Sequence, residues 1–231
     1  MKNCVALTLT DGDFQFRTGT FILAFYSLFH IAFRYSRRRT EKKRAEFASY
    51  VISSIHAICV CLASISFMAH PIYLPIAVAY FTVDLVCYAI PARDIFIIAH
   101  HAIMVLFPIA WYPQTGDLQW LATWIYAIEW SNLGLNMNYF SRVCYAPLAY
   151  NFSGYYILIV YGVTRLLWVP YILFTYYRVI EPPANCFILE PLFVSGMLFI
   201  FLTAIYYYFV KIVGNLQRLT RLQVSKLKAS S

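Results

Sequence analysis

The sequence predicts an all-α protein, a multi-pass transmembrane helical bundle of about seven helices. Charged residues make up only 12% of the 231 residues and hydrophobic residues 61%, and that charged share is about half the value usual in soluble domains. So few charges cannot cover a surface that faces water, whereas a bilayer suits such a chain. The 20 Tyr and 19 Phe, many of them near the ends of apolar segments, are typical of aromatic belts at membrane interfaces.

Seven apolar segments approach the length of about 20 residues that a helix needs to cross the hydrocarbon core. They are Thr18–Tyr35, Ala48–Met68, Ile72–Ile90, Asp94–Tyr112, Leu118–Phe140, Phe152–Tyr177 and Ile188–Val213. We expect the breaks between them at Pro71, Pro91, Pro113, Pro147 and the pair Pro182 and Pro183. Pro170 lies inside the sixth segment, where we expect a kink.

Three parts follow from this pattern. Residues 1–42 hold the first helix and a basic loop, residues 43–215 form a six-helix domain, and residues 216–231 form a basic tail. For residues 216–231 the sequence favours a tail that contacts solvent and lipid over a helix that binds a partner protein.

The basic residues alternate between the two sides of the predicted bundle. One side holds Arg37, Arg38, Arg39, Lys42, Lys43, Arg44, Arg93, Arg142 and the tail residues Lys211, Arg218, Arg221, Lys226 and Lys228. The other side holds only Lys2, Arg17 and Arg178. The positive-inside rule then predicts a lumenal or extracellular N-terminus and a cytosolic C-terminus.

The net charge of +8 lies in short loops and a tail, which favours contact with anionic lipid and excludes nucleic acid as the expected partner. The sequon at Asn151 falls on the cytosolic side of this topology, so we expect it to carry no glycan. The six cysteines lack the spacing of a zinc site. We expect neither a metal site nor a cofactor.

Ionisable residues occur inside five of the predicted spans, where a charge is costly and a functional role is the default hypothesis. They are His56, Asp84, His100, His101, Glu129 and Arg165. With a rise of about 1.5 Å per residue, all but Arg165 fall roughly 9–16 Å from the cytosolic ends of their spans, and Arg165 falls at roughly 20 Å. Such agreement in depth predicts a shared site, and Ser131 and Asn132 extend it as a polar stripe after Glu129.

Each of these residues also has a structural interpretation. His56 fits a buried histidine bonded to a neighbouring helix, and Asp84 fits a cap or an ion pair with Arg165. The stripe from Glu129 onward fits hydrogen bonds between helices. Because adjacent helical residues point about 100° apart, only one of His100 and His101 is expected to face the site.

The residue types suit proton transfer. A neutral histidine serves as a general base or nucleophile, and a carboxylate holds its ring in one tautomer. Transfer of an acyl group from acyl-CoA to a lipid needs such a base, and Arg165 or the loop Arg37–Arg44 would meet phosphates. A transporter and a receptor are further alternatives. The sequence lacks both the cytosolic acidic-arginine motif and the Asn-Pro motif that are usual in G-protein-coupled receptors.

Four segments, in order, resemble the TLC-domain family. Tyr50-Val-Ile-Ser-Ser-Ile-His56-Ala resembles its Ser-x-x-His-Ala segment, and Ala79-Tyr-Phe-Thr-Val-Asp84-Leu resembles its Gly-Tyr-Phe-x-x-Asp segment. His100-His101 resembles the paired histidines, and Glu129-Trp-Ser131 resembles a Glu-x-Ser segment. The resemblance runs from about Lys43 to Lys211.

This resemblance implies a helical bundle in the endoplasmic reticulum that binds a membrane lipid. The family includes ceramide synthases, which join a sphingoid base to an acyl group from acyl-CoA and in which the paired histidines are catalytic. In their His-Asp-x-Ser-Asp run the synthases carry aspartates that this chain lacks, since Glu129 is the only acid there. The smaller TLC proteins of lipid homeostasis are therefore the nearer expectation. The alternative is a lipid N-acyltransferase in which His100 or His101 acts and Asp84 or Glu129 orients it.

Overall fold

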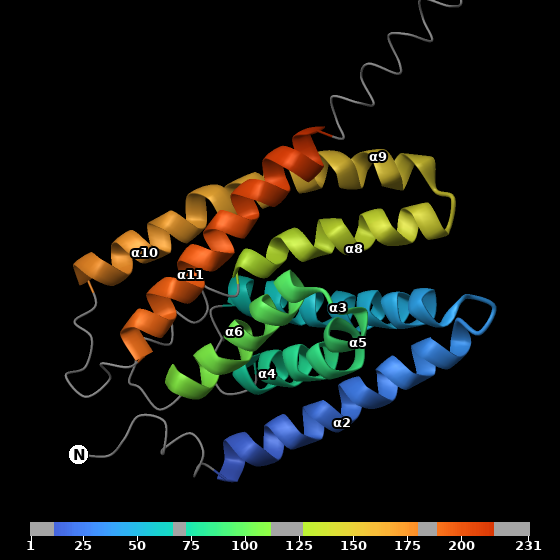
Figure 1. Ribbon diagram of the computed structural model, residues 1–231, viewed down its shortest axis with the longest axis horizontal. Coiled ribbons are helices and arrows are strands. Elements are labelled where there is room, and N and C mark those ends of the chain that lie inside the picture. Colours follow the sequence, from blue (N-terminus) through green and yellow to red (C-terminus); the bar gives the residue numbers. More distant parts are fainter. Residues whose placement is uncertain (1–11, 67–72, 112–126, 180–188, 215–231) are drawn as a thin grey trace, which may run out of the picture.

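The structure is a computed structural model that describes residues 12–66, 73–111, 127–179 and 189–214, and within these ranges it contains helices and no strand. The described chain forms seven helical segments. They are not all parallel, since α11 crosses the direction of α3 (Figure 1). The first three are α2 (Gly12–Tyr35), α3 (Glu41–Ser66), and α4 (Tyr73–Asp84) continued by η1 (Leu85–Ala89) and α5 (Ile90–Ala92). The prediction of an all-α bundle of about seven helices is confirmed.

The remaining four segments follow along the chain. They are α6 (Ile95–Trp111), η2 (Ala127–Glu129) with α8 (Trp130–Val143), α9 (Pro147–Tyr156) continued by η3 (Ile157–Leu167) and α10 (Trp168–Val179), and α11 (Leu189–Tyr206) with η4 (Tyr207–Val213). Three of the short elements, η1, η3 and η4, are π-helical, and η2 is a 3₁₀ turn.

Four helices of the described chain are long and apolar enough to cross a membrane, at Gly12–Tyr35, Glu41–Leu62, Tyr73–Ala92 and Pro147–Thr175. Two shorter apolar helices lie at Ile95–Leu106 and Val194–Val210. Their outward faces carry exposed Leu, Ile and Phe side chains, as a bilayer requires. The first part of the predicted fifth span, residues 118–126, lies outside the described residues.

Local sequence explains several helix ends. The Asp94 carboxylate accepts hydrogen bonds from the amides of Phe96 and Ile97 at 3.1 and 3.2 Å and so caps α6. Pro147 begins α9, where a missing amide hydrogen costs nothing. Pro170 lies in the first turn of α10, directly after the π-helical η3.

The break predicted at Pro91 falls two residues later than expected. Pro91 lies inside the last helical turn of its segment, and the chain leaves the helix only at Arg93, which adopts a left-handed conformation with φ 56°. Pro91 stands at the start of this short turn, and the preceding π-helical η1 has already interrupted the regular α-helical hydrogen bonds. A proline is tolerated there because no α-helical partner requires its amide hydrogen.

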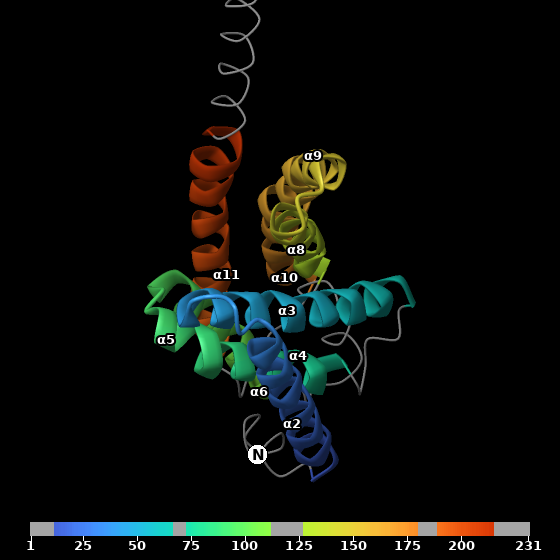
Figure 2. The same ribbon diagram turned by 90° about the vertical axis from the view of Figure 1, so that its right-hand side faces the viewer.

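Six of the helical segments form a closed ring of contacts. In turn α3 contacts α4, α4 contacts α6, α6 contacts α11, α11 contacts η3 and α10, η3 contacts α8, and α8 returns to α3. The helix α2 packs on the outer side of α3 and α4 (Figure 2), where Phe25 meets Tyr80 edge to face. The ring brings residues from distant parts of the sequence into one interior.

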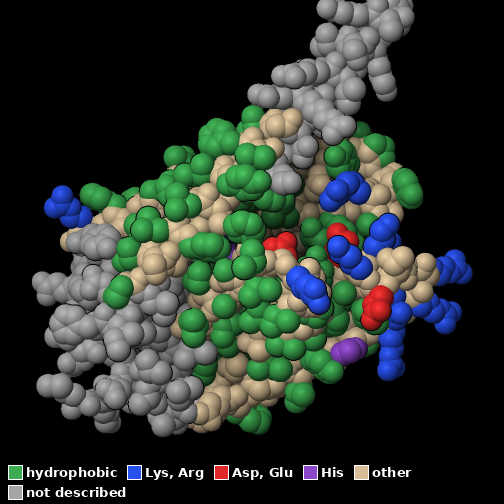
Figure 3. Space-filling model, in the orientation of Figure 1, with side chains coloured by type: hydrophobic (Ala, Val, Ile, Leu, Met, Phe, Trp, Pro, Cys, Tyr) green, Lys and Arg blue, Asp and Glu red, His purple; other side chains and the backbone are tan. Residues whose placement is uncertain are grey.

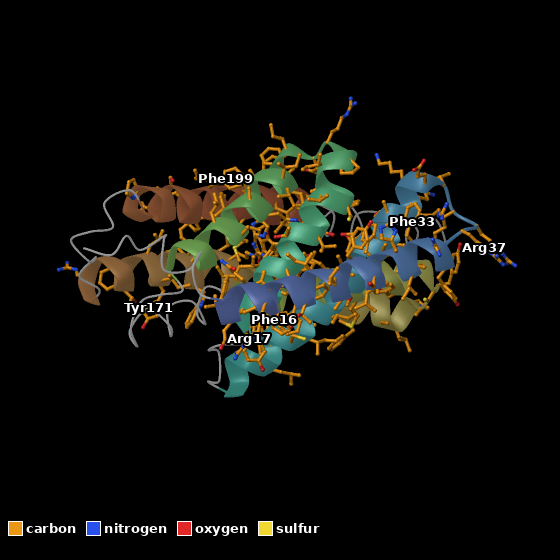
Figure 4. All side chains as sticks on the ribbon, turned by 90° about the horizontal axis from the view of Figure 1, so that it is seen from below. Phe16, Arg17, Phe33, Arg37, Tyr171 and Phe199 are labelled. Carbon is orange, nitrogen blue, oxygen red and sulfur yellow. The ribbon has the colours of Figure 1, made fainter. Side chains whose placement is uncertain are left out.

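The two ends of the bundle differ in charge. Figure 3 shows a face that is largely hydrophobic, with most Lys and Arg side chains gathered at one end. That end holds the turn between α2 and α3 and the turn between α8 and α9 (Figure 1). Arg17 and Arg37 lie toward opposite ends of α2 (Figure 4), and Arg178 ends α10 away from the basic end.

Candidate functional site

The first group of buried polar residues joins α4 and α6. The Nδ1 atom of His101 lies 3.4 Å from the Oδ2 atom of Asp84, close enough for an ion pair, but Nδ1 makes no hydrogen bond within the described residues. Only 2% of the Asp84 surface and 6% of the His101 surface are exposed. The ring of His101 also contacts the edge of Phe81. We call Asp84, His101 and the nearby His56 the histidine–aspartate cluster.

His56 of α3 completes this cluster through aromatic contacts. Its ring stacks on Tyr80 with a centroid distance of 4.1 Å and meets Phe81 edge to face at 5.1 Å. The side chain is 0% exposed, and within the described residues neither ring nitrogen has a hydrogen-bond partner. The expectation that His56 bonds to a neighbouring helix is therefore wrong, because its neighbours present ring faces and edges.

The second group joins η2 and α8 to η3. The Nη2 atom of Arg165 lies 3.6 Å from Oε1 of Glu129, which is 0% exposed. The Nε–H of Arg165 donates to the Ser131 hydroxyl at 3.2 Å, and the Asn132 amide donates to Oε2 of Glu129. The guanidinium also lies over the Tyr161 ring. We call this set the glutamate–arginine cluster.

His100 lies between the two clusters. Its ring is 5.5 Å from that of His101 and 5.9 Å from Phe81, centroid to centroid. It also interacts electrostatically with Arg165. His101 is the histidine of the pair that contacts Asp84, while His100 is only half-buried. The adjacent histidines thus have different surroundings.

The structure corrects one proposed pairing. The sequence left open an ion pair between Asp84 and Arg165, but Arg165 contacts Glu129 and Asp84 contacts His101. Asp84 ends α4 beside α6, whereas Arg165 belongs to η3, which packs against η2 and α8. Neighbouring helices in the ring therefore select the partners.

The asparagines of the polar stripe after Glu129 bond neighbouring helices, as the structural interpretation of the stripe predicted, whereas their serine partners were not predicted. Ser53 and Asn136 bond each other across α3 and α8, with the Asn136 amide donating at 3.1 Å and the serine hydroxyl donating at 3.3 Å. Asn138 donates to Ser153 at 3.0 Å, which joins α8 to α9. The asparagines of the stripe after Glu129 were the available signal, and this part of the stripe makes hydrogen bonds between helices.

The two clusters offer different chemistry. A carboxylate beside Nδ1 orients the His101 ring and leaves Nε2 to accept a proton. Arg165 is a fixed cation whose charge a single buried carboxylate offsets. In the described part of the chain no group of three His, Cys, Asp or Glu side chains could hold a metal ion.

No family model matches the chain, and no curated protein or solved structure matches it either.

Proposed function

We propose that the protein is a membrane-embedded lipid-binding protein of the TLC type that acts in lipid homeostasis. In this proposal it lies in the membrane of the endoplasmic reticulum with its basic end facing the cytosol. The headgroup of a membrane lipid would reach the histidine–aspartate cluster inside the bundle, close to His100. The observation that carries the proposal is a set of ionisable residues buried in an apolar bundle and only partly satisfied by one another.

Unpartnered polar atoms are the central support. Oδ1 of Asp84 and both nitrogens of His56 have no hydrogen-bond partner in the described chain. A buried polar atom without a partner costs about 1–3 kcal/mol, and native proteins seldom retain one without a reason. A ligand with hydroxyl or amine hydrogens would satisfy Asp84, and its apolar tails would suit the surrounding helices.

The alternative is an N-acyltransferase that uses acyl-CoA and a lipid amine such as a sphingoid base. The contact between Asp84 and His101 favours this alternative, because it would hold the proton on Nδ1 and leave Nε2 as the base. Nε2 would then take the proton of the attacking amine while the thioester carbon–sulfur bond breaks and the amide bond forms. The thiolate of CoA would leave with that proton.

One experiment separates the two candidates. The full chain, purified from membranes in mild detergent, is analysed for co-purified lipid by mass spectrometry. It is then incubated with acyl-CoA and a panel of sphingoid bases and lysophospholipids. The variants are Asp84→Asn and His101→Gln. The matched control is His30→Phe, because His30 on α2 contacts the nearby rings of Tyr26 and Phe29 and lies outside both clusters.

Each outcome decides between the candidates. Retained lipid that is lost in both variants but kept in His30→Phe, with no acylated product, supports lipid binding. Acylated product from the wild-type chain that disappears in His101→Gln supports the acyltransferase. A chain that retains no lipid and makes no product overturns both.

A further inference from the structure

The turn between α2 and α3 concentrates positive charge. Between Arg34 and Glu46 the chain carries seven basic residues and two acidic ones. We call residues 34–46 the basic turn. Arg37, Arg38, Lys42 and Lys43 within it are exposed. This density exceeds what is needed to set orientation, since the opposite end of the described chain carries only Arg17 and Arg178.

The basic turn is an ordered structure. The Nε–H of Arg44 donates to the Phe33 carbonyl at 3.1 Å, and its guanidinium lies 4.0 Å from the Phe33 ring centroid. Arg39 lies over the ring of Phe47. Backbone bonds from Arg37 to Arg34 and from Arg39 to Ser36 close the turn. Cations held in this way lose little conformational entropy when they bind a ligand.

A second turn brings one more cation beside the basic turn. The end of α8 packs on the start of α3, where Tyr50 stacks on Tyr139 at 3.8 Å and Phe47 meets Phe140 edge to face. Arg39 of the basic turn and Arg142 of α8 both interact electrostatically with Tyr139. The packing of α8 on α3 therefore places the cations of the two turns at the same end of the molecule.

This end of the molecule lies where lipid headgroups would be. Tyr35 at the end of α2 is 84% exposed, and Tyr145 after α8 is 91% exposed. Tyrosines with this exposure, next to helices long enough to cross a membrane, are typical of the interface between hydrocarbon and water. The anions available at that level are lipid phosphates.

We propose that the basic turn, together with Arg142, binds the headgroup of a phosphoinositide that carries more than one phosphate. The ordered guanidinium groups of Arg39 and Arg44, together with the exposed cations around them, favour a compact polyphosphate, because each guanidinium can bind a phosphate with two hydrogen bonds. Phosphatidylserine, which carries a single net negative charge, would leave most of these cations unused. The proposal concerns a surface separate from both buried clusters and does not depend on the proposed lipid-binding function.

The test measures lipid binding to the full chain in detergent by native mass spectrometry. The probes are dioctanoyl phosphatidylinositol bisphosphate and dioctanoyl phosphatidylserine. The test variant is Arg37→Gln with Lys43→Gln, and the control is Arg17→Gln with Arg178→Gln, which removes the same charge from the opposite end. Removal of two interfacial cations should weaken binding of the bisphosphate about tenfold in the test variant, and the control should change it less than about twofold.

A third variant separates recognition from charge alone. Arg37→Lys with Arg38→Lys keeps the charge and removes the paired donors, so it should weaken bisphosphate binding while leaving any phosphatidylserine binding unchanged. Equal affinity of the wild-type chain for both lipids overturns the proposal. Equal losses in the test and control variants also overturn it, as does the absence of bisphosphate binding. Circular dichroism and size-exclusion chromatography confirm that each variant is folded.

Discussion

The buried ionisable residues fall into two energetic classes. Glu129 and Arg165 form a pair that Ser131 and Asn132 extend, so part of the burial cost is offset within the cluster, although Oε1 of Glu129 makes no hydrogen bond within the described residues. His56 is buried with both nitrogens unpartnered, and stacking on Tyr80 replaces no hydrogen bond. The first class stabilises the fold through mutual contacts. The second class costs stability, which is typical of a residue kept for function.

Replacing Arg165 alone should lower the free energy of unfolding more than replacing both Arg165 and Glu129. Arg165→Met leaves the Glu129 carboxylate buried without a cation, so we expect a loss of about 3–5 kcal/mol in the free energy of unfolding. The double variant Arg165→Met with Glu129→Gln should recover a large part of that loss. Reversible unfolding in mixed detergent micelles measures both. If the double variant is less stable than Arg165→Met, the pair does not stabilise the fold in this way.

Replacing His56 by leucine should stabilise the protein. His56→Leu keeps a similar volume and removes two unpartnered nitrogens from the interior, so we expect the free energy of unfolding to rise by about 1 kcal/mol. Asn136→Leu is the matched control, because it removes an asparagine that is bonded to Ser53 and should therefore destabilise. The same unfolding assay compares them. A destabilised His56→Leu would show that the histidine has a structural role.

At the scale of elements, the contact between α8 and α9 depends on Gly134. A Cβ atom at this position would lie 2.4 Å from Cδ1 of Tyr156 and 3.0 Å from Cγ1 of Ile157. The missing side chain therefore lets the two helices approach closely enough for the Tyr156 hydroxyl to donate to the Trp130 carbonyl.

Gly134→Ala should therefore destabilise the bundle by about 1–3 kcal/mol through overpacking. Gly154→Ala on α9 is the control, because nothing lies within 4 Å of its Cβ position. Alanine has the higher helix propensity, so the control should be neutral or more stable by up to about 1 kcal/mol. Thermal unfolding of both variants in the same detergent provides the comparison. Equal losses of stability would show that the missing side chain of Gly134 is not what lets α8 and α9 approach each other.

Helix positions were predictable from the sequence because apolar length, prolines and the Asp94 cap are local signals. Helix α6 matches its predicted span to within one residue at each end, whereas α2 and α3 begin six and seven residues before their predicted spans. The partners of the ionisable residues were not predictable, since they depend on the order of helices around the ring and on the rotation of each helix. The pairing of Asp84 with His101 is the clearest case. His56 was marked as buried, but its aromatic surroundings require the three-dimensional structure.

At the scale of the whole molecule, the basic loops that alternate with weakly charged loops along the sequence lie together at one end. The turns after α2 and α8 lie at one end of the molecule, and the far end of α10 lies at the other (Figure 1). The positive-inside rule then predicts the orientation of the whole bundle from this one asymmetry. The basic turn, the sequon at Asn151 and Cys144 all belong to the end that we expect to face the cytosol.

Labelling with a thiol reagent that cannot cross membranes tests this orientation. Cys144 is an exposed cysteine near the turn after α8, so in sealed microsomes, whose outer face is cytosolic, it should react without detergent. The test uses a chain in which Cys4 and Cys186 are replaced by serine. The control adds Cys144→Ser and Arg178→Cys, which moves the thiol to the opposite end and should react only after the membrane is opened. The same orientation keeps Asn151 away from the glycosylation machinery of the lumen, so the mass of the chain should not fall on treatment with an endoglycosidase. A glycan at Asn151, or the reverse labelling pattern, would place the basic end in the lumen.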